Sequence, residues 1–261
     1  MNNTTLVQKD YAMVNGIKMY YEIYGEGKPL VLIHGGGSTI ETNWSNVLPL
    51  FAQHYKVIAV ELQAHGHTSD RNAPETFEQD ADDVAELLKQ LNINKAYILG
   101  FSNGGSTTMQ IAIRHSALAE KIVVIAAAYK RSGFIEGFFG WMENASLDNM
   151  PKPLQDAFLK INPDKNALQN MHDKDANRMR NFKDWNENDV KRISCPTLII
   201  NADKDVITVE HSLEISKAIP NAQLIILPGV HGECVGEKCS LNPNSKQYEI
   251  TIALVKEFLN N

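Results

Sequence analysis

Short runs of consecutive apolar residues recur along the chain, separated by longer segments in which apolar residues have helical spacing. A run that is apolar at every position indicates a strand covered on both faces, which is typical of a parallel sheet. Alternation of such strands with helices predicts an α/β fold with a doubly wound, mostly parallel sheet. The predicted strands are Ile17–Tyr24, Leu30–Ile33, Val57–Val60, Ala96–Leu99, Ile122–Ile125, Thr197–Ile200 and Leu224–Leu227.

The clearest helical segment begins after Thr76, a residue type that caps helix N-termini well, with Gln79 three positions later. A second helix is predicted over about Gln247 to Leu259. The apolar stripe of the first helix consists of Phe77, Ala81, Val84, Leu88 and Leu91. Its charged residues lie mostly off this stripe, as expected for a helix that packs on a sheet.

The alternation stops between about residues 130 and 188, where the sequence predicts helices and no strand. This stretch is rich in aromatic and methionine side chains, most of which we expect to form its own small core. We interpret 130–188 as a helical cap over the carboxyl edge of the sheet. Residues 1–129 and 189–261 then form the core domain.

Composition excludes several classes of protein. With 43% hydrophobic and 21% charged residues in a chain of 261, the protein is an ordinary globular one. A net charge of −6 argues against a nucleic-acid or anionic-membrane partner. The chain shows no signal peptide and no membrane span, which predicts a cytoplasmic protein. Cys195, Cys234 and Cys239 are expected to be free thiols, the alternative being a loop disulfide between the last two.

The most informative motif is G-F-S-N-G at Gly100–Gly104, which stands between a predicted strand and a predicted helix. A glycine two residues to either side of Ser102 removes Cβ atoms that would clash in a sharp turn. The turn places Ser102 at a helix N-terminus, where developing negative charge is favoured. These features indicate a catalytic nucleophile.

A serine nucleophile needs a general base and an acid that orients the base. His231 directly follows the predicted strand Leu224–Leu227 and is the expected base. Two acids, Asp203 and Asp205, stand on the loop after the strand Thr197–Ile200. From the residues alone, either acid remains possible.

With these motifs the chain resembles the α/β-hydrolase superfamily, in its cofactor-free serine esterase and perhydrolase-like branch with a helical cap. The similarity extends from Tyr20 to Phe258. Similar sequences have a G-D-x-D-x-V loop whose second aspartate is the triad acid, which implies Asp205 here, with Asp203 capping the loop. The resemblance implies that no cofactor is needed.

The resemblance also points to an oxyanion hole. Residues 34–38 read H-G-G-G-S and match the family's oxyanion loop, which implies an N–H donor at Gly36, or as second choice at Gly37. The other donor is expected at Asn103, directly after the nucleophile. His34 is interpreted as a structural residue. The glycine run is no dinucleotide fingerprint, because Ile40 stands where a third glycine is required.

An alternative is a metal-dependent hydrolase. Two histidines in the pattern His65-x-His67, with Asp70 nearby, are residue types that can bind zinc. No further histidine has a supporting spacing, and relatives show G-H-G-x-S in the same place, so we predict no metal site. Relatives usually have an aspartate where this chain has Glu61. This departure concerns the packing of the loop and not the triad.

A serine at the elbow predicts an acyl-enzyme intermediate and therefore a small carboxylic ester, thioester or lactone as substrate, as in a carboxylesterase. The alternatives are a C–C bond hydrolase or perhydrolase of the same fold, and a non-catalytic receptor or scaffold. Four aromatic residues are candidates for an apolar substrate pocket: Phe101, Phe138, Trp141 and Trp185. The expected partner is a small apolar acyl substrate, and the sequence does not indicate an oligomeric state.

Overall fold

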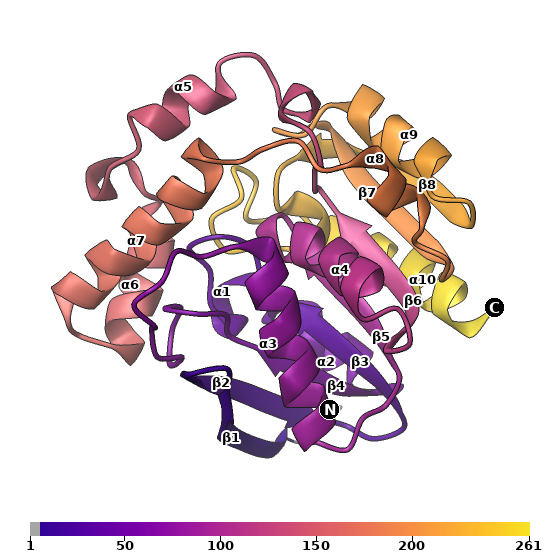
Figure 1. Cartoon of the computed structure of the whole chain (residues 1–261), viewed down its shortest axis with the longest axis horizontal. Helices are drawn as coiled ribbons and strands as arrows, with labels where there is room; N and C mark the ends of the chain where they lie inside the picture. Colours follow the sequence, from indigo (N-terminus) through magenta and orange to yellow (C-terminus); the bar gives the residue numbers. More distant parts are fainter. Residues whose placement is uncertain (1–5) are drawn as a thin grey trace.

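One sheet of eight strands runs through the computed structural model, which describes residues 6–261 (Figure 1). The strand order is β1-β2-β4-β3-β5-β6-β7-β8. β2 pairs antiparallel with both β1 and β4, and the other neighbours are parallel. This confirms the predicted fold class. The strands are β1 Leu6–Val14, β2 Ile17–Tyr24, β3 Lys28–Ile33, β4 Tyr55–Val60, β5 Ala96–Phe101, β6 Ala119–Ile125, β7 Thr197–Lys204 and β8 Ala222–Val230.

The edge strand β1 was not predicted. Only its last residue, Val14, is buried, and the sequence LVQKDYAMV carries charged residues at its centre. A strand that is exposed along almost its whole length shows neither the continuous apolar run nor the alternation on which the prediction rests.

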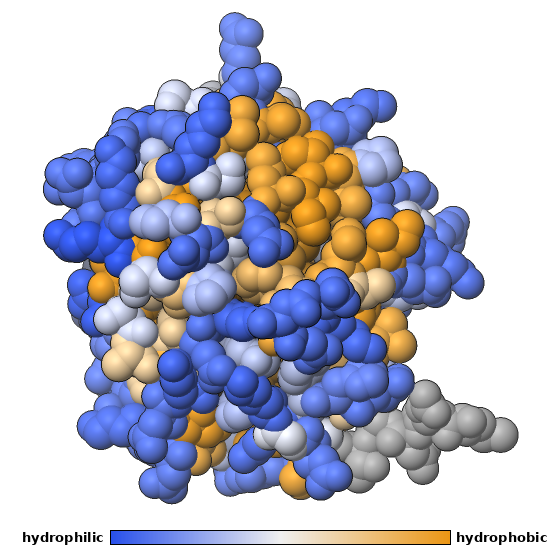
Figure 2. Space-filling view, turned by 90° about the vertical axis from the view of Figure 1, so that its right-hand side faces the viewer, coloured by the Kyte–Doolittle hydropathy of each residue, from blue (hydrophilic) through white to orange (hydrophobic). Residues whose placement is uncertain are grey.

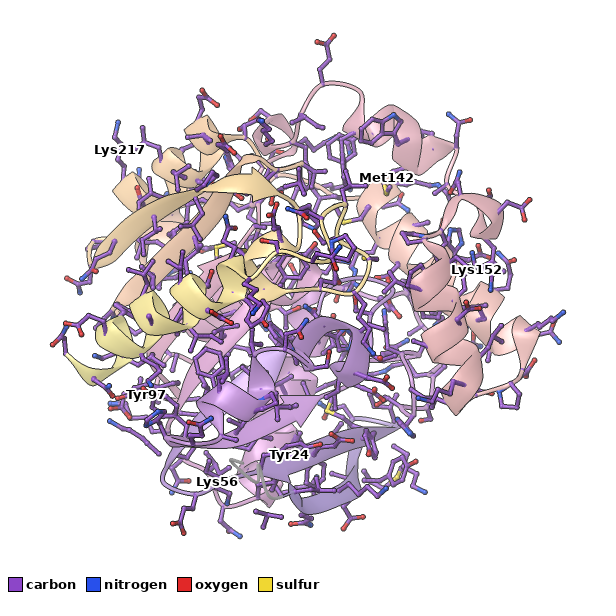
Figure 3. The ribbon with its side chains drawn as sticks, turned by 180° about the vertical axis from the view of Figure 1, so that it is seen from behind. Tyr24, Lys56, Tyr97, Met142, Lys152 and Lys217 are labelled. Atoms are coloured by element: carbon purple, nitrogen blue, oxygen red, sulfur yellow. The ribbon has the colours of Figure 1, made fainter. Side chains whose placement is uncertain are left out.

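Helices cover both faces of the sheet and create two hydrophobic layers. Neighbouring positions of β5 show the division, since Ile98 belongs to one layer and Leu99 to the other. On the first face lie α3 (Phe77–Gln90), α4 (Asn103–Arg114), α8 (Glu187–Lys191) and α9 (Val209–Ala218); on the second lie α1 (Ile40–Trp44), α2 (Leu48–Phe51) and α10 (Gln247–Asn260). At the end of α10, the Tyr97 hydroxyl donates to the Leu259 carbonyl at 3.0 Å (Figure 3).

The long connection from β6 to β7 carries the cap helices. These are the 3-10 turns η1 (Arg131–Gly133) and η2 (Leu147–Asn149) with α5 (Phe138–Glu143), α6 (Lys152–Ile161) and α7 (Lys165–Arg180). Figure 1 shows α5, α6 and α7 grouped at one side of the sheet. Phe158, Leu168 and Met171 form a small buried cluster with Ala64 of the core. The domain limits at 130 and 188 remain a prediction.

The surface includes an apolar area over the β8 side of the sheet (Figure 2). Leu213 of α9 and Ile250 of α10 are among the exposed large apolar side chains. Within residues 6–261, no helix combines the length and the apolar character that a membrane span requires. All three cysteines are free thiols.

Candidate active site

Ser102 lies at the sharp turn between β5 and α4. Its φ of 55° and ψ of −121° are strained for a residue with a side chain. The Ser102 N–H donates to the Ile125 carbonyl at 2.8 Å, which holds the turn against β6. A Cβ at Gly100 would lie 2.0 Å from the Gly104 carbonyl oxygen, and one at Gly104 would lie 2.1 Å from that of Ile33. Only glycine at these two positions allows the turn.

Three side chains that follow β5, β7 and β8 form a hydrogen-bonded series. His231 directly follows β8, and its Nε2 lies 3.1 Å from Ser102 Oγ. Its Nδ1 lies 2.7 Å from Oδ1 of Asp205, which follows β7. Burial of His231 disfavours the imidazolium, but the Asp205 carboxylate outweighs this effect and raises the pKa of His231 above 6.5. This is the geometry of a nucleophile, a base and an orienting acid.

The two candidate acids occupy different positions. Asp205 is buried, and besides facing His231 its Oδ1 accepts from the Ile207 N–H at 3.1 Å. Asp203 is exposed, and its Oδ1 accepts from the Gly229 N–H at 2.8 Å. Asp203 thus lies within the longer strand that the structure shows and ties the end of β7 to the end of β8, while Asp205 alone of the two contacts His231.

The glycine loop after β3 lies beside Ser102. Gly36, Gly37 and Asn103 all line the same cavity as the serine. The Gly37 N–H, however, donates to Asp175 Oδ2 at 2.6 Å, so in this arrangement it is not available to an oxyanion. This contradicts the expectation that Gly37 is a possible donor. Gly36 and Asn103 remain the proposed pair.

His34 supports this loop from below. The Leu62 N–H donates to His34 Nε2 at 3.0 Å, so the proton of the ring is on Nδ1, which lies 2.7 Å from the Gly35 carbonyl oxygen. Complete burial lowers the pKa of His34 to about 3, and the ring is neutral at ordinary pH. His34 is not among the residues that line the cavity, and its ring contacts only backbone groups of Gly35 and Leu62 by hydrogen bonds, consistent with a structural residue.

Comparison with known proteins decides the family. The model of the alpha/beta hydrolase family matches residues 30–235, which includes the glycine loop, the serine turn and His231. The chain belongs to this family.

The relatives of this chain include proteins named for different substrates. The chain is 27% identical over 252 residues to a putative esterase/lipase of Haemophilus influenzae, covering 88% of this chain and 83% of that protein. It is 33% identical over 121 residues to a 2-hydroxy-6-oxo-6-(2'-aminophenyl)hexa-2,4-dienoic acid hydrolase of Metapseudomonas resinovorans, covering 45% of this chain and only 42% of that protein. A meta-cleavage product hydrolase from Pseudomonas fluorescens IP01 has the same fold, with a TM-score of 0.77 and 24% identity over 96% of this chain and 97% of that one.

A cavity of about 320 Å³ in this chain opens onto Ser102 and His231. Its wall is largely apolar and comes mostly from the cap and from the loops after β6 and β7. The apolar lining includes Phe77, Ala126, Ala127, Ala128, Phe134, Phe138, Met142, Met150, Leu154, Met179, Phe182, Val206 and Ile207.

Of the four aromatic residues predicted for the pocket, only Phe138 lines it. Phe101 is buried beneath the catalytic loop, with its ring 4.7 Å from that of His231. Trp141 is 58% exposed, and Trp185 packs against Phe77 on the far side of the cavity wall. The prediction was wrong for these three because composition does not show which way a side chain faces, whether it lies on a strand (Phe101), a short helix (Trp141) or a loop (Trp185).

Sequence reasoning missed most of the wall, including Asp175, the one carboxylate among the described residues that line it. Asp175 lies on α7 among several other charged residues, and nothing in that pattern separates it from a solvated helix face. The methionines of the cap were noted as a group, but their spacing did not indicate that Met142, Met150 and Met179 converge on one cavity.

The two histidines of the His65-x-His67 pattern serve different carboxylates. His65 Nε2 lies 2.9 Å from Asp175 Oδ2, and His67 Nδ1 lies 2.9 Å from Glu61 Oε2. The Glu61 carboxylate also accepts from the His67 N–H at 2.7 Å. Glu61, a departure from the family pattern, therefore holds this loop by direct contacts. Among residues 6–261, no three or more metal-ligating side chains come together as a metal site.

Proposed function

We propose that this chain is a serine hydrolase that cleaves small, apolar carboxylic esters, thioesters or lactones through an acyl-enzyme. The observation that carries the proposal is the series Ser102–His231–Asp205 at the edge of an apolar cavity. A hydroxyl within reach of an imidazole that is itself oriented by a buried carboxylate is the arrangement that acyl transfer requires.

The proposed reaction uses only side-chain and backbone groups. Ser102 Oγ attacks the acyl carbon while His231 Nε2 takes its proton, and Asp205 stabilises the imidazolium through Nδ1. The N–H groups of Gly36 and Asn103 stabilise the negative oxygen of the tetrahedral intermediate. His231 returns the proton to the leaving oxygen or sulfur. Water, deprotonated by His231, then attacks the acyl carbon; the bond from that carbon to Ser102 Oγ breaks, and His231 returns the proton to Oγ, which releases the acid and free Ser102.

The cavity favours an ester substrate over the acidic substrates that some relatives' names describe. The M. resinovorans relative is named a hydrolase of a dienoic acid, which carries a carboxylate. Of the described residues that line the cavity here, none is a lysine or an arginine. A substrate carboxylate would find no lysine or arginine to pair with in this largely apolar site, which is costly.

Hydrolysis of p-nitrophenyl esters of increasing acyl length tests the proposal. We expect release of p-nitrophenol from the short esters by the wild type, with an initial burst as the acyl-enzyme forms, and none above background by Ser102→Ala. If the folded wild type cleaves no ester or thioester of the series, the proposed activity is refuted. The interpretation as a non-catalytic receptor or scaffold then replaces it.

A further inference from the structure

One cap residue, Asp175, contacts both segments from which the oxyanion N–H groups come. Its Oδ2 accepts from the Gly37 N–H at 2.6 Å, on the loop that contains Gly36. Its Oδ1 accepts from the side-chain amide of Asn103 at 3.2 Å. The carboxylate thus bridges α7 of the cap, the loop after β3 and the first residue of α4.

The three partners are packed so closely that their relative positions depend on one another. A Cβ at Gly36 would lie 2.6 Å from Asn103 Nδ2 and 3.2 Å from Asp175 Oδ2. The glycine loop has no side chains of its own to hold it, because residues 35–37 are all glycine. His34 and Asn43 hold the loop at Gly35, and Asp175 is the fixed hydrogen-bond acceptor that holds it at the Gly37 N–H.

The carboxylate itself is held by two cations that lie behind it, outside the cavity wall. Arg178 donates to Oδ1 and also to Asp80 Oδ2 of α3, at 2.7 Å. His65 donates to Oδ2 from Nε2, and its Nδ1 lies 2.7 Å from the Gln63 carbonyl oxygen, so both of its nitrogens carry protons. The Gly37 nitrogen also lies 3.2 Å from His65 Nε2, but a protonated Nε2 cannot accept a hydrogen bond, so the acceptor for the Gly37 N–H is Asp175.

The charges agree with this arrangement. Burial alone raises the pKa of Asp175, but His65 and Arg178 outweigh it and hold the pKa well below its usual range. Burial lowers the pKa of His65, and the carboxylate reverses this and raises it to about 9. At neutral pH the pair is ionised, and charged acceptors form the stronger hydrogen bonds to backbone N–H groups.

We infer that Asp175 is a positioning residue, through which the cap holds the Gly36–Gly37 loop and Asn103 in the geometry that stabilises the oxyanion. This inference rests on the proposed function. Preorganised donors contribute most of their effect in the transition state, so loss of this restraint lowers kcat with little change in KM.

The test compares Asp175→Asn with a matched control, Asp156→Asn, which removes an exposed carboxylate from the neighbouring cap helix. The readouts are kcat and KM for p-nitrophenyl butanoate, per serine titrated with a fluorophosphonate, and Ki for 1,1,1-trifluorohexan-2-one, which forms a tetrahedral adduct with the serine. We expect Asp175→Asn to lower kcat and raise Ki by about 10- to 100-fold each, with KM within about twofold. Asp156→Asn should match the wild type.

Asn103→Ala removes the side-chain amide that donates to Asp175 and leaves α7 unchanged. We expect a fall in kcat in the same direction, and a double variant whose loss is less than the product of the two single losses. If Asp175→Asn does not fold, this variant carries the test alone, and an unchanged kcat overturns the inference.

The outcomes separate the two proposals. A wild type that cleaves no ester refutes the proposed function, and the inference falls with it. A wild type that cleaves butanoate, with kcat per titrated serine and Ki unchanged in Asp175→Asn, refutes the inference alone. A merely structural residue would lower the titrated fraction and the melting temperature without moving Ki per site.

Discussion

His231 Nε2 lies 3.1 Å from Ser102 Oγ although 129 positions separate the two residues in the chain. Ser102 follows β5 and His231 follows β8, and two strands stand between these in the sheet. The loop after β8 must therefore reach back across the carboxyl edge. The ring of Phe101 lies 4.7 Å from that of His231 and supports the histidine where the loop approaches Ser102.

The pKa of His231 determines how the reaction depends on pH. The base must be neutral, and Asp205 raises the pKa of His231 above 6.5, so kcat/KM should rise with pH through a midpoint above 6.5. In Asp205→Asn the burial of His231, which lowers that pKa, loses its main opposing influence, and only the smaller effect of Glu237 still raises the pKa. We expect the ascending limb of the pH profile to move to lower pH and kcat to fall by orders of magnitude, about 10⁴-fold. A limb that stays in place would show that another group is the base.

The serine turn makes Gly104 irreplaceable. An alanine there would place its Cβ 2.1 Å from the Ile33 carbonyl oxygen, whereas Gly140 on α5 has open space around it. Gly104→Ala should lose about 3 kcal/mol or more of unfolding free energy and the ability to react with a fluorophosphonate. Gly140→Ala should be neutral or stabilising by up to about 1 kcal/mol. Chemical denaturation of the two variants checks both, and equal stability would contradict the turn geometry.

Neighbouring residues of α5 should differ in their effect on substrate size. Met142, labelled in Figure 3, lines the cavity, whereas Trp141 is 58% exposed. Met142→Trp should fill part of the cavity and lower kcat/KM for the hexanoate ester relative to the acetate ester by about tenfold or more. Trp141→Ala should leave that ratio unchanged. If Trp141→Ala changed the ratio and Met142→Trp did not, Trp141 would line the pocket, as the sequence predicted.

Asp175 should also give the cavity a preference for charge. Its cationic partners, His65 and Arg178, lie outside the wall, so the cavity faces the carboxylate. Among p-nitrophenyl esters, the β-alanine ester is a cationic mimic of the butanoate and the hydrogen succinate an anionic one. We expect the wild type to prefer the cationic ester to the anionic one by about tenfold or more. If the two charged esters were cleaved equally poorly, the cavity would discriminate against polar substrates whatever the sign of their charge.

Much of this fold was predictable because its sheet is covered on both faces. Strands such as β5 consist of residues that are buried on either side, and this produces the continuous apolar runs. The same logic fails for β1, which is exposed along most of its length. The serine turn was also readable, since its steric demands select glycine at Gly100 and Gly104.

Site residues were predictable where they directly follow a strand, because the end of the strand then fixes where they lie in space. His231 and Asp205 follow β8 and β7 directly, so the topology alone brings them to Ser102. The cap has no strand whose end would fix the position of its residues in the same way. Its short helices can present any side to the cavity, which is why Trp141 was chosen and Met142 was not. Asp175 depends on tertiary pairing with Gly37, and no local pattern reveals that contact.

The measurement that tests the central claim most directly is the intact mass of the protein after treatment with a fluorophosphonate, for the wild type, Ser102→Ala and His231→Ala. An activated serine reacts at the rate that its base allows, so we predict one adduct on the wild type and none on either variant. The absence of an adduct on folded wild type, or an adduct that persists in Ser102→Ala, would contradict the assignment of Ser102 as the nucleophile.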